Sequence, residues 1–116
     1  HNAFLWVVDI TKEELPLPVA TFIVPFEGKS THQNRFGAHQ PAEQVYGNTL
    51  YVTWFAGGLR AIDFSNPYIP KEVGYYVPMP GKGQSAVMSN DVFHDKDGKL
   101  YLMDRYEGLE VLEPQI

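Results

Sequence analysis

The sequence of 116 residues lacks cysteine, has fewer basic than acidic residues, and contains no long apolar run. The absence of cysteine excludes disulfides, thiolate metal sites and cysteine nucleophiles. Nine Lys and Arg residues against fourteen Asp and Glu give a formal net charge of −5 at pH 7, which disfavours binding to nucleic acid backbones. No apolar stretch approaches the length of a transmembrane helix. We therefore expect neither a nucleic acid partner nor a membrane span.

Two catalytic signatures are also missing from the sequence. No serine lies in a Gly-x-Ser-x-Gly elbow, and no glycine-rich phosphate loop follows a strand and opens a helix. The composition is nevertheless that of a folded globular protein, with 44% hydrophobic, 14% aromatic and 20% charged residues. Disorder is therefore not expected.

The clearest local pattern is a strand, a tight turn and a second strand in residues 50–64. Residues 50–55 are rich in β-branched and aromatic side chains, and residues 59–64 form a second apolar run. Gly57 and Gly58 between them supply the positive φ angles of a hairpin turn. A turn at residues 65–67 and a further strand at 71–77 follow, so the sequence predicts a three-stranded meander.

This pattern recurs along the chain. Residues 100–113 match residues 50–63 at an offset of 50, and residues 4–10 match residues 58–64 at an offset of 54. A period near 50 residues, built from short strands and glycine turns, is typical of β-propeller blades. We expect an all-β fold of about two and a half four-stranded blades.

The repeat divides the chain into three parts. Residues 1–25 are interpreted as the end of one blade, residues 38–78 as the middle blade, and residues 87–116 as a last, incomplete blade. Residues 38–45 and 88–94 are expected to be innermost strands, which line the central channel of a propeller. Because a propeller has about four to eight blades, we expect the chain to be the C-terminal part of a larger one. The remaining blades of the same polypeptide, or other chains, would complete it.

The residues from Gly58 to Pro67 read glycine, a mostly apolar segment, Asp, Phe, Ser and Asn-Pro. This segment resembles the LVIVD repeat of bacterial β-propeller proteins, with degraded copies at residues 5–11 and 108–113. The last copy departs from the family pattern, because Glu113-Pro114 stands where the family has Asp and a Ser-Asn-Pro turn. The resemblance implies a propeller fold and an extracytoplasmic setting, either periplasmic or secreted. A more distant similarity is to selenium-binding-protein-like propellers, which can carry metal-binding histidines.

The two expected innermost strands carry the candidate metal ligands and catalytic groups. His39 and His94 are candidate ligands of a divalent transition metal, and Glu43 or Asp91 is a candidate further ligand or general base. Asn90, in the same segment as Asp91, is a further candidate for the central channel. The alternative interpretation is structural, because polar residues at such positions often satisfy backbone groups or hold channel water. For His94 the alternative is that it begins the turn at residues 94–98.

A second candidate site is a ligand-binding rim of aromatic and basic side chains. The loop at residues 25–37 carries a small basic patch, which could instead be an ordinary solvated loop. Aromatic and arginine side chains together suit sugars, aromatic acids or a protein partner. For Trp54 the alternative is core packing. The candidate rim residues are Lys29, His32, Arg35, Gln40, Trp54, Phe55, Arg105 and Tyr106.

The leading functional hypothesis is a binding or scaffold module that presents loops on one rim to a ligand or protein partner. The alternative is a metal-dependent enzyme, an oxidoreductase or hydrolase, with its site at the central channel. A third hypothesis is a purely structural role within an assembly.

Overall fold

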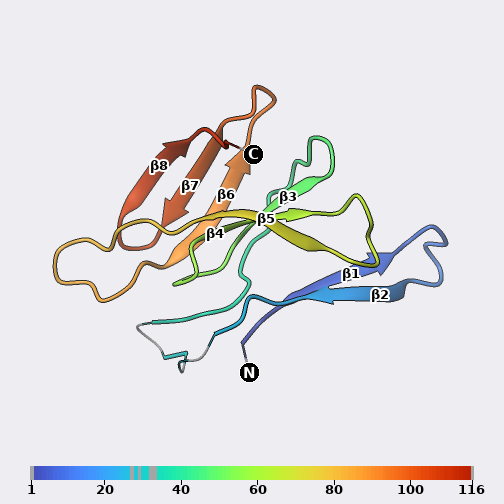
Figure 1. Cartoon of the computed structure of the whole chain (residues 1–116), viewed down its shortest axis with the longest axis horizontal. Helices are drawn as coiled ribbons and strands as arrows, with labels where there is room; N and C mark the ends of the chain where they lie inside the picture. Colours follow the sequence, from blue (N-terminus) through green and yellow to red (C-terminus); the bar gives the residue numbers. More distant parts are fainter. Residues whose placement is uncertain (1, 27, 29, 32–33, 116) are drawn as a thin grey trace.

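The computed structural model describes residues 2–26, 28, 30–31 and 34–115, which form eight strands and no helix (Figure 1). These residues therefore include no helix that could cross a membrane. The strands form three antiparallel sheets in chain order: β1 (Leu5–Asp9) and β2 (Leu17–Phe22); β3 (Thr49–Thr53), β4 (Leu59–Asp63) and β5 (Lys71–Tyr76); β6 (Ser89–His94), β7 (Leu100–Asp104) and β8 (Gly108–Leu112). The all-β class is confirmed for the described residues. None of their sheets closes on itself, and the propeller remains a prediction.

The segment before β3 differs from the prediction of a regular strand over residues 38–45. It runs beside β3, with the Ala42 amide donating to the Tyr51 carbonyl at 2.8 Å, but it contains only an isolated bridge between Pro41 and Val52. The pairing is irregular, because Thr53 accepts from the His39 amide at 2.9 Å and donates to the Gln40 carbonyl at 3.0 Å, so that two residues of the segment face one residue of β3. The prediction of a strand at residues 38–45 is therefore wrong. The strand predicted at residues 88–94 is present as β6.

The first and middle sheets pair their strands in the same register at the offset of 54 residues. Leu5 pairs with Phe22 in the β1–β2 ladder, and Leu59 pairs with Tyr76 in the β4–β5 ladder. All five pairs of one ladder recur in the other, and both ladders shift register after the third pair. The offset found in the sequence is thus also the offset of the backbone pairing.

The turns after β1 and β4 are closed by the same side-chain hydrogen bonds. An oxygen of Asp9 accepts from the Thr11 amide at 2.8 Å, and an oxygen of Asp63 accepts from the Ser65 amide, also at 2.8 Å. The hydroxyls of Thr11 and Ser65 donate to the same carboxylates. Such turns end a strand because the side chain replaces the ladder as a backbone partner.

The middle and third sheets are related in the same way at the offset of 50. Tyr51 pairs with Ala61 between β3 and β4, and Tyr101 pairs with Val111 between β7 and β8. Four successive pairs of the two ladders correspond. The third sheet therefore presents its side chains with the alternation of the middle sheet.

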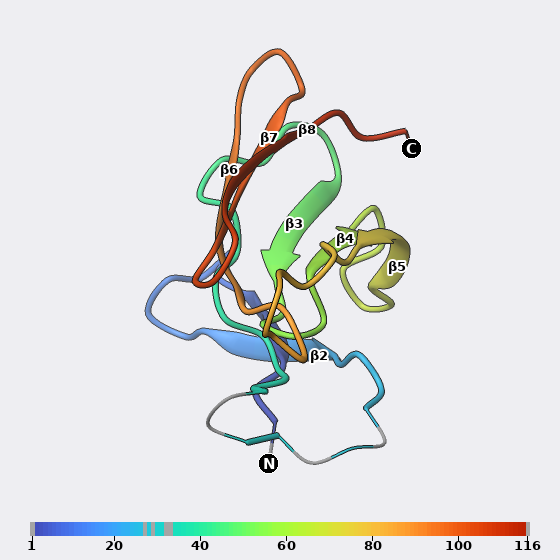
Figure 2. The same ribbon diagram turned by 90° about the vertical axis from the view of Figure 1, so that its left-hand side faces the viewer.

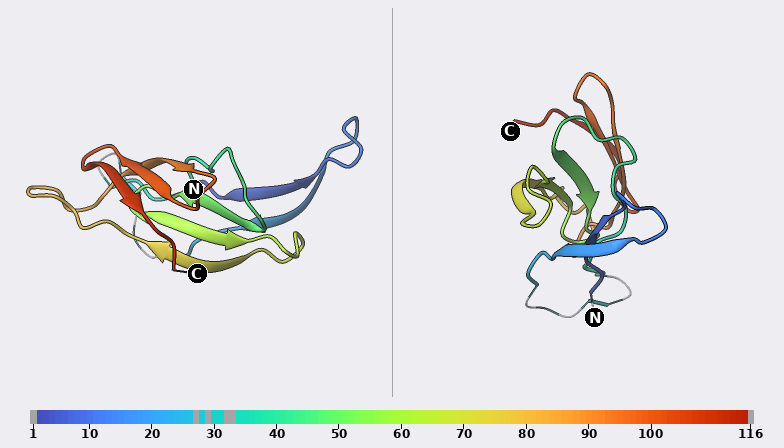
Figure 3. Two further views of the ribbon diagram at one scale, coloured as in Figure 1. Left: turned by 90° about the horizontal axis from the view of Figure 1, so that it is seen from above. Right: turned by 90° about the vertical axis from the view of Figure 1, so that its right-hand side faces the viewer.

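The middle sheet is covered on both faces, and Figure 1 shows it between the other two sheets, which Figures 2 and 3 show from other sides. One apolar cluster joins the first and middle sheets and contains Val24, Val52, Trp54 and Ile62, with Leu5 and Phe22 packed against it. A second cluster joins the middle and third sheets and contains Ala42, Tyr51, Leu59, Ala61, Val92, Leu100 and Leu102. Burial on both faces explains why these strands are apolar at successive positions.

Candidate ligand-binding site at Phe55

The turn between β3 and β4 holds Phe55 in an unusual backbone conformation. The Trp54 amide donates to the Gly58 carbonyl at 2.7 Å, which closes the turn, and Gly58 has a φ of 74°. Phe55 itself has a φ of 51°, in the left-handed region that side chains disfavour. Two backbone hydrogen bonds between Phe55 and Ser89, of 3.1 and 3.0 Å, fix this conformation. They also tie the turn to the start of β6.

Three basic side chains surround the Phe55 ring. The guanidinium carbons of Arg35 and Arg105 lie 6.0 and 5.5 Å from the ring centroid, and the His39 ring centroid lies 4.6 Å from it. Each comes from a different segment. Arg35 lies in the connection after β2, His39 in the segment beside β3, and Arg105 in the turn after β7. A ring face attracts cations weakly, so Phe55 gives these groups a common surface.

Asn90 fixes two of these basic groups. Its carbonyl accepts a hydrogen bond from His39 Nδ1 at 2.5 Å and another from Thr53 Oγ1 at 2.9 Å, and its side-chain oxygen accepts from Arg105 Nε at 2.5 Å. Because a carbonyl only accepts, the His39 proton lies on Nδ1, and Nε2 is the ring atom left for a ligand. Among the described residues, Asn90 is the sole acceptor for the Arg105 side chain, so its terminal nitrogens are available.

A buried carboxylate holds the turn that carries Arg105. Asp104 is only 4% exposed, and one of its oxygens accepts from the Met88 amide at 2.9 Å and from Ser89 Oγ at 3.3 Å. Its other oxygen accepts from the amides of Tyr106 and Glu107 at 2.9 and 3.2 Å. The Asp104 carboxylate thus binds backbone amides and holds the turn in place.

The structure brings three of the predicted rim and channel residues together at Phe55, namely Arg35, His39 and Arg105. Gln40 follows His39, and its backbone carbonyl accepts from the amide of Thr53 at 3.0 Å. Lys29 and His32, also assigned to the basic patch, lie outside the described residues.

Trp54 lies in the core and not on the rim. Its exposed fraction is 0%, and its ring meets Phe22 edge-on at 6.0 Å. A side chain without exposed surface cannot contact a ligand on the rim, so its assignment as a ligand-binding residue is replaced by the packing interpretation.

The two candidate metal-binding histidines are not brought together. His39 contacts Asn90, the second residue of β6, whereas His94 is the last residue of that strand. Four residues of extended strand span about 13 Å. His94 is 6% exposed and lies edge-on between the rings of Tyr46 and Tyr51, each 5.0 Å away. Burial lowers the pKa of His94, and nearby Asp95 opposes this shift.

The candidate acidic groups are both exposed. Asp91 accepts from the amide of its neighbour Val92 at 2.8 Å, and Glu43 lies in the segment beside β3. Within the described part of the chain, no group of three or more His, Cys, Asp or Glu side chains could hold a metal ion. The structure thus gathers no metal-ligand set around these four candidates.

Sequence reasoning named Asn90 only as a channel residue, and it missed Thr53. Thr53 is fully buried and links the segment beside β3 to β6, because its hydroxyl lies 3.2 Å from the Gln40 carbonyl as well as 2.9 Å from that of Asn90. A threonine in an apolar strand gives no signal of such a contact. It follows from the way the middle and third sheets stack.

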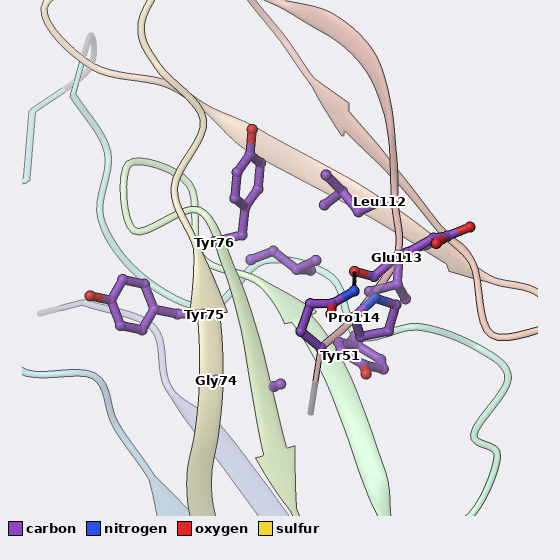
Figure 4. Close-up of a pocket in the computed structure, with 11 residues that line it drawn as sticks. Tyr51, Gly74, Tyr75, Tyr76, Leu112, Glu113 and Pro114 are labelled. Atoms are coloured by element: carbon purple, nitrogen blue, oxygen red, sulfur yellow. Dashed lines mark hydrogen bonds between the residues drawn. The ribbon is translucent and has the colours of Figure 1, made fainter.

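A separate hollow lies between β5 and the chain after β8 (Figure 4). It has a volume of about 410 Å³ and a mostly apolar lining that includes Tyr51, Tyr76 and Leu112. The Tyr76 hydroxyl donates to Glu110 at 3.1 Å. Burial raises the pKa of Tyr51, and burial together with Glu110 raises that of Tyr76. None of the basic groups at Phe55 lines this hollow.

Comparisons of the chain with protein-family models, with curated proteins and with solved structures give no match.

Proposed function

We propose that the chain is a binding module built of LVIVD-type propeller blades, and that the basic cluster at Phe55 binds an aromatic carboxylate. The observation that carries the proposal is the convergence of Arg35, His39 and Arg105 on one aromatic ring. Asn90 holds two of these groups in place before any ligand arrives. Such preorganisation lowers the entropic cost of binding.

The chemistry of the cluster favours an anion with a planar part. A guanidinium donates two parallel hydrogen bonds to a carboxylate. Phe55 is half-buried and supplies an apolar surface for a ring of the ligand. The chain as a whole carries a net charge of −5, so this cluster is a local exception that would attract and orient an anion.

The propeller part of the proposal is supported by the arrangement of the sheets. Meander sheets stack in chain order, and their ladders repeat at offsets of 54 and 50 residues. In this proposal the remaining blades come from the same polypeptide or from other chains. The resemblance to LVIVD proteins makes a periplasmic or secreted location part of the same hypothesis.

Calorimetric titration of the chain with benzoate tests the binding proposal. We expect saturable binding that benzamide, a neutral molecule of the same shape, does not reproduce. Arg105→Gln should weaken benzoate binding at least about tenfold, because a charged hydrogen bond contributes about 1.5–3 kcal/mol. Lys12→Gln removes the same charge from the loop after β1 and should leave binding unchanged. Equal binding of benzoate and benzamide, or equal loss in both variants, would refute the site.

A further inference from the structure

The two internal sheet contacts use the same pair of faces each time. We call the face of a sheet that carries Leu59 and Ala61, or their counterparts, its forward face, and the face that carries Val52 and Ile62, or their counterparts, its back face. Leu5 is the counterpart of Leu59 and lies on the forward face of the first sheet. This face packs against the back face of the middle sheet. The forward face of the middle sheet in turn packs on the back face of the third.

The third sheet leaves its forward face open to solvent. Leu109 is 57% exposed, whereas its counterpart Leu59 is 3% exposed. Val111 is likewise 57% exposed, against 4% for Ala61. Met103 pairs with Leu109 on the same face and is 44% exposed. The residues of this face pair in the same register as those on the forward face of the middle sheet, which is buried inside the chain.

The first sheet leaves its back face open at the other end of the stack (Figures 1 and 2). Val8 is 41% exposed, whereas its counterpart Ile62 is 0% exposed. Trp6 is 58% exposed, and its ring lies 5.4 Å from that of Phe4. An open Trp, Val and Phe on one side of a strand pair are unusual on a surface without a partner.

We infer that the forward face of the third sheet docks onto the back face of the first sheet of a second copy of this chain. The two open faces are the two halves of a contact that the chain already makes twice internally, and one copy carries both halves. A contact between two different surfaces is heterologous, so each added copy again presents one open face of each kind. The association is head-to-tail, and it gives a ring where the rotation between copies closes and an open filament where it does not.

Sedimentation of the 116-residue chain over a roughly hundred-fold concentration range tests this inference, because association follows mass action. The wild-type mass should rise above the 13.1 kDa of one chain. Leu109→Lys blocks the forward face and Trp6→Lys blocks the back face, and each variant alone should remain at 13.1 kDa. Met79→Lys places the same charge on a loop residue that is 86% exposed, and it should associate like the wild type.

Mixing the two blocked variants separates head-to-tail docking from other kinds of association. Each blocked variant keeps the half that the other lacks, so the mixture should form a complex of twice 13.1 kDa and nothing larger. A wild-type chain that stays monomeric would overturn the inference. So would self-association of Trp6→Lys alone, because that variant could associate only through two forward faces or through an unrelated surface.

Discussion

Phe55 and Ser89 exchange two backbone hydrogen bonds, of 3.1 and 3.0 Å, that join the turn after β3 to the start of β6. The exchange holds Phe55 at a φ of 51° and leaves its ring beside Arg35, His39 and Arg105. One contact between two sheets therefore positions the whole basic cluster. The strain at Phe55 is the cost of placing an aromatic ring there.

Replacing Phe55 by glycine and by alanine separates the backbone strain from the contribution of the ring. Both variants lose the ring, but only glycine adopts a φ of 51° without steric cost. We expect Phe55→Gly to be more stable than Phe55→Ala by about 1 kcal/mol in urea unfolding. At Phe93, inside β6, the order should reverse, because glycine weakens a regular strand. The same order at both positions would contradict the assigned conformation.

Gly58 and Gly108 occupy corresponding turns and should respond differently to alanine. Both have positive φ, 74° and 81°, so each substitution should cost about 1–2 kcal/mol in backbone strain. A Cβ at Gly58 would lie 2.3 Å from the Tyr76 carbonyl oxygen, whereas a Cβ at Gly108 meets nothing within 4 Å. Gly58→Ala should therefore lose a further 1–3 kcal/mol or so of unfolding free energy. Equal losses would mean that β5 does not lie against this turn.

His94 should make stability fall as the solution becomes mildly acidic. Burial lowers the pKa of His94, so the unfolded chain binds the proton more tightly than the folded chain does. The folding stability that neutral His94 contributes is present above the pKa of the unfolded histidine. It is lost as the pH falls through the pKa of His94 in the folded chain. The unfolding free energy of the wild type should begin to drop as the pH falls through about 6.5, the pKa of an unfolded histidine. In His94→Phe, which keeps a ring between Tyr46 and Tyr51, that drop should shrink, and an unchanged drop would refute the assignment.

Asp9 should titrate at an unusually low pH. The hydroxyl and amide of Thr11 both donate to its carboxylate, and they lower its pKa below the ordinary aspartate value. Thr11→Val removes the hydroxyl donor, which is the larger cause, so the titration midpoint seen by NMR should rise. Thr21→Val makes the same change on the neighbouring strand β2 and should leave the midpoint of Asp9 where it was. No difference between the two variants would show that the turn after β1 is not closed as described.

The sequence predicted the sheets well, because their signals are local. Apolar and β-branched runs marked the strands, and glycine and Asx turns marked their ends. The matched spacing of these signals also anticipated the offsets of 54 and 50 at which the ladders repeat. The prediction of a strand at residues 38–45 was wrong, because this segment pairs with β3 only through an isolated bridge and a few irregular backbone hydrogen bonds.

The candidate site was predicted only in part, because it depends on contacts between sheets. Arg35, His39 and Arg105 were each named from residue type, yet only the stacking of β6 on the middle sheet gathers them at Phe55. The pairing of His39 with His94 rested on their places in comparable segments of two repeats. The structure separates them along β6, since one lies beside Asn90 and the other ends the strand.

The most direct test of the binding site is the NMR signal of Arg105 Nε during a titration with benzoate. In the free chain this group donates to the side chain of Asn90. We predict a saturable shift of the Arg105 Nε signal with the same midpoint as shifts of the Phe55 ring, and none with benzamide. An Arg105 signal that stays unchanged while benzoate binds elsewhere on the chain would contradict the account.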